Sequence, residues 1–330
     1  MPTAKSALKT LQTLQSISFV MPVLNEERYL RAAVESILQQ SVPGAVEVVL
    51  ALGPSVDGTN EIARELASQH KVVQLVDNPK GTTSAALNVA ISAAQNDVVI
   101  RVDAHSKLSA GYAELAVLVL NETGADNVGG IMHAVGETAF QSAVAWAYMS
   151  RVGLGGGAFH VGGVAGPADS VYLGVFRRTK LVELGGFDER IIRGQDWELN
   201  LRIRESGGLV WFDPRLEVAY HPRSSWAKLA SQFFDTGLWR GQLTRKNLRQ
   251  TGLRYFAPPI LVLGTLAGLA LYISGWPVGL IPVAGYFGLI GLAAAAARGV
   301  SIGSRLWLLA VLPTMHFAWG TGFIAGLFRR

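Results

Sequence analysis

Two short acidic stretches beyond the middle of the chain carry residue types that could take a proton from a hydroxyl group. The first, residues 185–189 (GGFDE), begins with a double glycine, which allows a backbone turn where a Cβ would clash. The second brings Asp196 and Glu198 to the start of an amphipathic run, where a helix dipole would keep both carboxylates ionised. An ionised carboxylate in a cleft is what a general base requires. A simple acidic helix cap gives the same pattern, so these residues alone leave both interpretations open.

The first hundred residues alternate between apolar runs and helical patterns. The expected strands cover residues 17–23, 46–50, 72–76 and 97–102, and the expected helices begin at Asn25, run from 60 to 69 and pass through 88–94. Such alternation is typical of doubly wound α/β sheets, which bind ligands beyond the carboxyl ends of their strands. Five polar residues fall at those ends: Asn25, Glu26, Asp57, Asn78 and Asp103.

Asp103 and His105 form a candidate metal site. Two residues one apart at the end of a strand can reach the same ion, and Mg²⁺ or Mn²⁺ prefers oxygen ligands, with a diphosphate completing the shell. A bound metal would offset the charge that develops on a departing diphosphate. An Asp-x-His pair is a weak signal by itself.

The last third of the chain has a different composition. Half of all residues are hydrophobic and 16% are charged, and few charges follow residue 256. Three apolar segments, about 256–274, 276–297 and 306–328, are near the length of a transmembrane helix. The absence of cysteine excludes disulfides and thiolate metal sites. The polar N-terminus lacks the apolar core of a secretion signal, so we expect the globular part to remain in the cytoplasm.

Basic residues gather just before the first apolar segment: Arg240, Arg245, Lys246, Arg249 and Arg254. The positive-inside rule expects such a cluster at a cytoplasmic membrane face, so we expect membrane lipid and no nucleic acid as its partner. A tight link at residues 275–277 predicts a helical hairpin, and Arg298 and Arg305 would return the chain to the cytoplasm. A third crossing would leave Arg329 and Arg330 outside, against the charge rule. Either the third segment is re-entrant or the larger basic cluster near 240–254 dominates, and the sequence leaves both open.

Taken in order, several motifs resemble the family 2 glycosyltransferases, inverting enzymes with the nucleotide-sugar-binding GT-A fold. They are residues 22–27 (PVLNEE), 57–59 (DGT), 103–105 (DAH), 185–189 (GGFDE) and 195–196 (QD). The resemblance covers residues 16–245. Within the family, the chain is similar to membrane-tethered enzymes of bacterial exopolysaccharide assembly, including the succinoglycan type, through residues 169–178 and the apolar tail.

The resemblance implies a mostly parallel central sheet flanked by helices, and a role for each matching residue. The nucleotide-sugar, most often linked to uridine, would be held by Pro22, Val23, Asn25, Glu26, Asp57 and Asp103. Outside these motifs, we also expect Asn78, at the end of a strand, and Arg240, in an interfacial helix, to contact it. Asp196 would be the catalytic base, although Gln195 replaces the family's usual Glu. A divalent Mn²⁺ or Mg²⁺ would be held by Asp103, by His105 in place of the family's second Asp, and by His221; imidazole suits Mn²⁺ better.

The sequence therefore predicts four regions: an N-terminal extension (1–15), a GT-A domain (16–225), an interfacial basic segment (226–255) and a membrane domain (256–330) with two or three transmembrane helices. The glycine-rich span from Gly153 to Pro167 is expected to be a loop, closing over substrate or merely connecting.

The expected activity is transfer of a sugar from a nucleotide-diphospho-sugar to a polyprenyl-linked saccharide at the bacterial cytoplasmic membrane, with the catalytic domain facing the cytoplasm and other polysaccharide-assembly proteins as possible partners. Two alternatives stay open: transfer to polyprenyl phosphate itself, and a non-catalytic scaffold that binds nucleotide-sugar.

Overall fold

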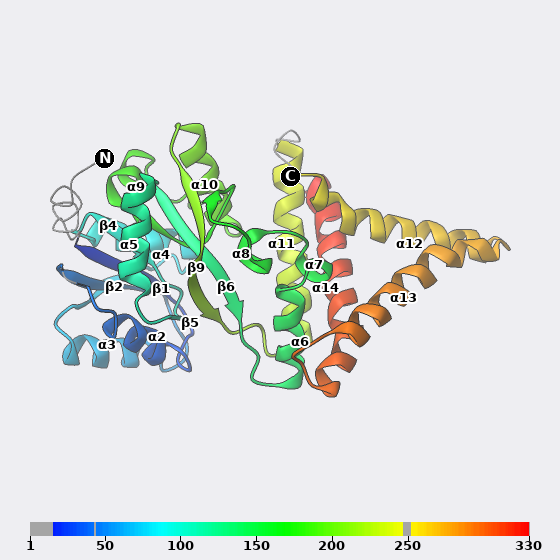
Figure 1. Cartoon of the computed structure of the whole chain (residues 1–330), viewed down its shortest axis with the longest axis horizontal. Helices are drawn as coiled ribbons and strands as arrows, with labels where there is room; N and C mark the ends of the chain where they lie inside the picture. Colours follow the sequence, from blue (N-terminus) through cyan, green and yellow to red (C-terminus); the bar gives the residue numbers. More distant parts are fainter. Residues whose placement is uncertain (1–15, 43, 247–251, 330) are drawn as a thin grey trace, which may run out of the picture. The chain divides into compact units, whose positions relative to one another are not determined.

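The computed structural model describes residues 16–42, 44–246 and 252–329, and it divides into two compact units (Figure 1). The first unit contains the described residues up to His133 together with Gly162–Tyr220. The second contains Ala134–Val161 and the described residues from His221 onward. The expected extension 1–15 and residues 247–251 of the expected basic segment lie outside the described residues.

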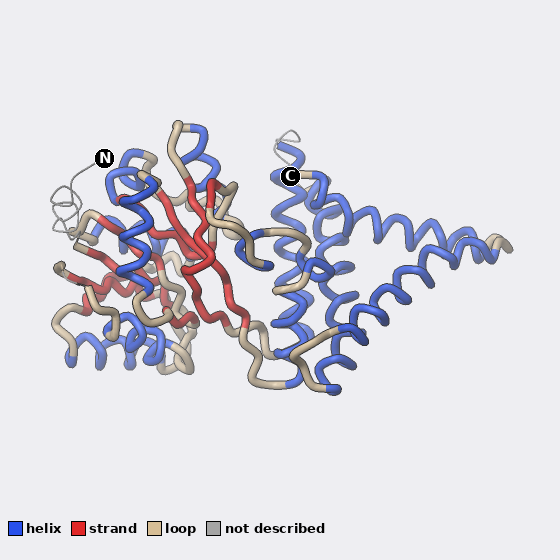
Figure 2. Tube along the Cα trace, in the orientation of Figure 1, coloured by secondary structure: helices blue, strands red, loops and turns tan. Residues whose placement is uncertain are grey.

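The first unit is built on one nine-stranded sheet, drawn in red in Figure 2. The strand order is β3-β2-β1-β4-β8-β6-β9-β5, and β7 pairs with β9. The strands are β1 (Ile17–Val23), β2 (Val46–Leu52), β3 (Val73–Asp77), β4 (Val98–Arg101), β5 (Ser106–Leu108), β6 (Asn127–Ala134), β7 (Gly166–Pro167), β8 (Tyr172–Arg177) and β9 (Val210–Tyr220).

The direction of the strands changes at β4. The strands β3, β2, β1 and β4 are parallel, as the alternation of their sequence predicted. Beyond β4 the paired strands run antiparallel. Val20 of β1 lies in register with Val49 on one side and Arg101 on the other, so the carboxyl ends of these strands meet at one edge.

Helices cover this sheet through their apolar faces: α2 (Leu30–Leu38), α3 (Thr59–Gln69), α4 (Thr83–Ala93), α5 (Tyr112–Thr123), α9 (Arg178–Glu183) and α10 (Gln195–Glu205). Leu30, Val34 and Ile37 of α2 are buried in the core that they share with β1 and β2. The sequence placed the start of this helix at Asn25, but α2 begins five residues later. Asn25 has a left-handed backbone (φ 56°), which interrupts a helix at that point.

The second unit is helical. Its elements are α6 (Ala139–Tyr148), α7 (Arg151–Leu154), α8 (Ala158–Val161), α11 (Trp226–Lys246), η2 (Leu253–Phe256), α12 (Ala257–Ile273), η3 (Pro277–Leu280), α13 (Ile281–Ala296) and α14 (Ile302–Phe328). Three stretches are long and apolar enough to cross a membrane: Leu253–Ile273, Pro277–Ala296 and Ile302–Phe328. The expected loop at 153–167 contains the end of α7, the whole of α8 and the short strand β7.

The helix α11 packs closely against α14 through glycines on both helices. A Cβ on Gly237 or Gly241 would collide with the backbone of α14, and one on Gly322 or Gly326 would collide with the backbone of α11. Paired glycines four residues apart let two helix backbones approach closely. The N-terminal part of α14 packs instead against α6, where the rings of Phe140 and Trp307 meet edge to face at 5.2 Å. These contacts explain why residues 134–161, expected in the N-terminal domain, group with the C-terminal helices.

This packing predicts an engineered disulfide between α6 and α14. A Cβ built on Gly303 lies 3.7 Å from the Cβ of Ala139, within the range of disulfides, and both residues are exposed. Because the chain has no cysteine, Ala139→Cys/Gly303→Cys is expected to form one intramolecular bridge on mild oxidation, seen as a shift on a non-reducing gel. Neither single variant should shift. Free thiols in the oxidised double variant would contradict the packing.

Candidate active site

Loops at the carboxyl ends of β1 and β2 are joined by hydrogen bonds. The backbone N–H of Asn25 donates to Ser55 Oγ (3.0 Å), and Asn25 Oδ1 accepts from the N–H of Val56 (2.9 Å). The N–H of Glu26 donates to Thr59 Oγ1 at 2.7 Å. These bonds satisfy backbone groups that the left-handed turn at Asn25 removes from a helix. The two loops therefore form one fixed wall at the end of the parallel strands.

Asp57 and Asn78 stabilise the turns in which they lie. Asp57 accepts hydrogen bonds from the hydroxyl and the N–H of Thr59, and the hydroxyl bond is the main cause that lowers the pKa of Asp57. Asn78 is buried after β3 and donates from Nδ2 to the carbonyl of Thr82 at 3.2 Å. Pro22 and Val23 form the end of β1 beside these turns. Apart from Arg240, the residues predicted to bind nucleotide are thus gathered at one edge of the sheet.

His105 is held by Glu26. Its Nδ1 lies 2.9 Å from Glu26 Oε1, and its ring meets Tyr220 edge to face at 5.7 Å. A carboxylate at Nδ1 fixes the orientation of an imidazole and makes its other nitrogen a better ligand. Glu26, predicted as a nucleotide contact, therefore has a positioning contact with the predicted metal ligand.

The buried guanidinium of Arg101 binds both Asp103, the predicted metal ligand, and Asp196, the predicted base. Arg101, the last residue of β4, has a side chain only 5% exposed. It donates from Nε (3.1 Å) and Nη2 (3.0 Å) to Asp103 Oδ1, and from Nη1 to Asp196 Oδ1. Burial alone would lower the pKa of Arg101, but the two carboxylates raise it, so the residue stays charged. Asp103 and Asp196, 93 residues apart in sequence, are brought together by one cation.

Asp196 differs from the expected helix-cap carboxylate in its titration. It lies in the first turn of α10, as predicted, with its side chain 34% exposed. Burial nevertheless raises its pKa above the ordinary 3.8, outweighing the opposing effect of Arg101, while Asp103 raises it further. Burial and two charged side chains therefore act on this carboxylate in addition to its place at the helix start. A raised pKa brings a carboxylate closer to the operating range of a general base.

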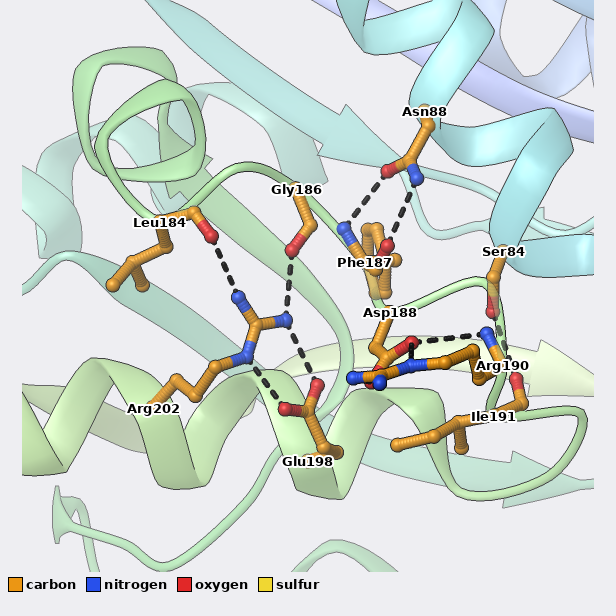
Figure 3. Close-up of polar contacts among 10 residues, drawn as sticks. All are labelled: Ser84, Asn88, Leu184, Gly186, Phe187, Asp188, Arg190, Ile191, Glu198 and Arg202. Carbon is orange, nitrogen blue, oxygen red and sulfur yellow. Dashed lines mark hydrogen bonds and ion pairs between the residues drawn. The ribbon is translucent and has the colours of Figure 1, made fainter.

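The loop before α10 is fixed by Asn88 of α4 (Figure 3). Asn88 Oδ1 accepts from the N–H of Phe187 (2.8 Å), and Nδ2 donates to the carbonyl of Phe187 (2.8 Å) and to Glu189 Oε1 (3.2 Å). Gly186 has φ 73°, and a Cβ there would collide with Asn88 Oδ1, so this position requires glycine. The double glycine thus allows the turn, and Asn88 holds it.

Arg202 fixes the same loop from the other side. It donates to the carbonyls of Leu184 (2.8 Å) and Gly186 (2.7 Å), and its guanidinium forms a two-bond ion pair with Glu198. Figure 3 shows Glu198 directed along the helix toward Arg202. Of the two carboxylates predicted at this helix start, Glu198 is therefore structural, and Asp196 faces Arg101.

Further residues behind the site had no role assigned to them from the sequence. Asn200, one turn after Asp196, accepts from Asn127 Nδ2 at 2.6 Å and donates to Ser170 Oγ at 3.0 Å, which anchors α10. The hydroxyl of Tyr172 lies 3.3 Å from Ser106 Oγ, and burial, with a smaller contribution from Asp103, raises the pKa of Tyr172. The sequence could have indicated these residues only as polar side chains within otherwise apolar strands and helices.

Comparison with known proteins decides the family. The model of glycosyl transferase family 2 matches residues 18–181, the part that carries the parallel strands and Asp103. The succinoglycan biosynthesis protein ExoA of Rhizobium meliloti is 34% identical over 321 residues, which is 94% of each chain. The chain belongs to glycosyltransferase family 2. It is thus a transferase, as the motif order had predicted.

A further relative and two solved structures are also similar to this chain. A Methanococcus voltae glucuronosyltransferase that acts on a dolichyl-linked sugar is 27% identical over 240 residues, covering 70% of this chain and 74% of its own. The mannosyltransferase PcManGT of Pyrobaculum calidifontis, solved with GDP-Man and Mn²⁺, has a TM-score of 0.60 at 19% identity and covers 98% of this chain and 93% of its own. TarS of S. aureus with UDP-GlcNAc has a TM-score of 0.55 at 14% identity, covering 94% and 90%. These likenesses show the GT-A fold.

The transferase offers one carboxylate and one imidazole for a divalent metal. Among the described residues, no three side chains of His, Asp or Glu gather as a metal site, so Asp103 and His105 would form a partial donor set. Such a set fits a metal that takes most of its ligands from a substrate diphosphate and water. The fixed orientation of His105 by Glu26 is consistent with this use.

Two predicted site residues of the transferase belong to the second unit. His221 Nδ1 lies 3.8 Å from Glu137 Oε1. Arg240 is buried in α11, with its guanidinium over the rings of Tyr255 (4.1 Å) and Trp239 (4.8 Å), and burial lowers its pKa. The assignment of these two residues to metal and diphosphate stays a prediction.

The clamp at Asn88 can be tested by an isosteric change. In Asn88→Asp, a carboxylate would face the carbonyl of Phe187 and the carboxylate of Glu189 in place of a donor. We expect a loss of about 1–3 kcal/mol in the free energy of unfolding, since a partly buried hydrogen bond becomes repulsive. Denaturant unfolding of the purified protein measures it, with Gln39→Glu, at an exposed amide after α2, as the matched control. Equal stability of Asn88→Asp and the control would contradict the clamp.

Proposed function

We propose that this transferase moves one sugar, with inversion, from a nucleotide-diphospho-sugar to a lipid-linked saccharide, with Asp196 as general base. The observation that carries the proposal is the shared guanidinium of Arg101. Arg101 donates hydrogen bonds to both Asp196 and Asp103, so a single side chain separates the two carboxylates. Asp103 follows β4, at the edge where such sheets bind nucleotides. A base and a leaving-group site must be this close for a single displacement.

The proposed step uses one base and one attack. Asp196 takes the proton of an acceptor hydroxyl, whose oxygen attacks the anomeric carbon on the face opposite the nucleoside diphosphate. The C–O bond to the acceptor forms as the bond to the diphosphate breaks, so an α-linked donor gives a β-linked product. The raised pKa of Asp196 supports proton acceptance, and the α10 anchors keep the carboxylate in position.

A divalent metal bound by Asp103 and His105, with Mn²⁺ favoured by the imidazole, would stabilise the negative charge of the leaving diphosphate. The nucleoside would be held by Pro22, Val23, Glu26 and Asp57, at the end of β1 and in the joined loops. Asn25 and Asn78 would contribute to binding of the nucleotide-sugar at the same edge. Glu26 would act partly through His105, and Asp57 partly by shaping its turn.

A lipid-linked acceptor at the cytoplasmic membrane is supported by the apolar C-terminal helices and by two relatives. ExoA is named for succinoglycan biosynthesis, and the Methanococcus voltae enzyme is named for a dolichyl-linked acceptor. The second name supports a saccharide on a polyprenyl carrier, and the first supports a role in polysaccharide synthesis. UDP-, GDP- and dTDP-sugars are the donor candidates.

The donor and the base can be tested together. The purified protein in lipid is supplied with each radiolabelled nucleotide-sugar, Mn²⁺ or Mg²⁺, and membrane lipid extract as acceptor. We expect one donor to label a lipid-linked saccharide, and Asp196→Asn to lose about 10²–10⁴-fold in rate, the usual contribution of a positioned base. Thin-layer analysis identifies the product. Label on polyprenyl phosphate alone would favour the alternative acceptor. A wild-type rate of turnover by Asp196→Asn would exclude Asp196 as the base.

The pH dependence should report the environment of Asp196. Because burial raises its pKa, the acid limb of kcat/KM is expected above the ordinary carboxyl pKa of 3.8. Arg101 opposes this shift, so Arg101→Met should move the limb to still higher pH and lower kcat/KM by about 10–100-fold. Arg101→Lys keeps the charge and should leave the limb nearer its original position. A limb that does not move in Arg101→Met would contradict the coupling.

A further inference from the structure

The hairpin of α12 and α13 has the surface of a membrane-inserted element. No Asp, Glu, Lys, Arg or His lies between Arg254 and Arg298. Only 17% of the best apolar window in each helix is buried within the protein. Large apolar side chains are exposed along both helices: Ile260, Leu263, Leu266, Leu271, Ile273, Phe287, Leu289 and Leu292. Exposure of so continuous an apolar surface to water is unfavourable, so we expect lipid to cover it.

The helix α14 has a different environment. Its apolar window has a lower mean hydropathy, 1.4 against 1.9, and 39% of it is buried in the protein. Between Val311 and Leu327 only Thr321 is exposed. The neighbouring helices α11 and α12 cover the rest, through contacts such as Gly322 with the backbone of Phe234 and Gly320 with the backbone of Pro258. This half of α14 has little surface left for lipid.

The partner helix α11 cannot accompany α14 through hydrocarbon. It carries Lys228, Asp235 and Arg240, and its glycines hold its backbone directly against α14. Charged side chains at the centre of a bilayer are costly. Because the two helices are packed backbone to backbone, α14 cannot cross without α11.

The midpoint of α14 also contacts a backbone carbonyl in a four-residue helix beside a glycine-rich turn. His316 Nε2 lies 2.8 Å from the carbonyl of Val152, and its Nδ1 lies 2.9 Å from the hydroxyl of Tyr286. Val152 is in the four-residue helix α7, next to the exposed Arg151 and a glycine-rich turn. If α14 spanned the membrane, these polar groups would lie near the bilayer centre, where exposed irregular backbone does not occur.

We propose that α14 does not cross the membrane, and that among the described elements only the α12–α13 hairpin enters it, leaving on the side from which it came. In Figure 2, α12 and α13 converge on their connecting turn, while α6 and α11 lie alongside α14. Both ends of the hairpin then lie on the side that holds α11. Arg254, Arg298, Arg305 and Arg329 all fall on that one side, which satisfies the positive-inside rule that a third crossing would break.

The absence of native cysteine makes this topology directly measurable. Single-cysteine variants Ser224→Cys, before α11, and Arg329→Cys, after α14, replace exposed residues outside the site. Each is reacted with a membrane-impermeant maleimide in intact spheroplasts and in permeabilised ones, beside a periplasmic cysteine protein as a positive control. We expect both variants to react at least about tenfold more after permeabilisation, as for two sites on the cytoplasmic face. A cysteine appended after Arg330 repeats the test with no substitution in the helix.

The outcomes separate the topologies. Labelling of Arg329→Cys in intact spheroplasts, with Ser224→Cys protected, would mean a third crossing and overturn the proposal. Labelling of Arg329→Cys only in detergent would place the C-terminus within lipid and overturn it equally. Leu266→Cys, on the exposed face of α12, is expected to react only in detergent; labelling without detergent in either preparation would mean that lipid does not cover the hairpin.

Discussion

One buried cation, Arg101, is the constraint on which the candidate site depends. Its side chain is removed from water, so its charge requires nearby negative partners, and Asp103 and Asp196 supply them. The consequence is geometric as well as electrostatic. The end of a parallel strand and the start of a helix from the other half of the domain are fixed to the same guanidinium, and with them the leaving-group side and the base side of the proposed reaction.

Other polar contacts of the first unit serve this arrangement. Asn88 and Arg202 fix the glycine turn that leads into α10, and Asn200 anchors the helix one turn beyond Asp196. The side chains of these residues form hydrogen bonds with backbone or amide groups that have no partner within a helix or strand. The proposed base is therefore held by residues that need never contact substrate.

The sequence predicted the parallel half of the sheet well, because its strands are short apolar runs separated by helices. It also predicted which polar residues stand at the strand ends. It did not reveal Arg101, since an arginine at the end of an apolar strand carries no spacing signal, and its two partners are recognised only once the sheet has formed. The antiparallel strands were missed for a related reason: their pairing joins residues far apart in the chain. The start of α2 was misplaced because the left-handed turn at Asn25 depends on hydrogen bonds from the next loop. In the second unit, hydropathy predicted three apolar helices but could not distinguish a helix covered by lipid from one covered by α11 through glycine contacts.

The stereochemistry of transfer tests the central claim most directly. The enzyme is supplied with a donor that carries an α-linked sugar. Proton NMR then gives the anomeric configuration of the first product from the coupling constant of the anomeric proton of the transferred sugar. A β-linked product would agree with a single displacement in which Asp196 activates the acceptor. An α-linked product would mean retention, and it would contradict Asp196 as the base of a direct attack and the role given to the Arg101-linked carboxylates.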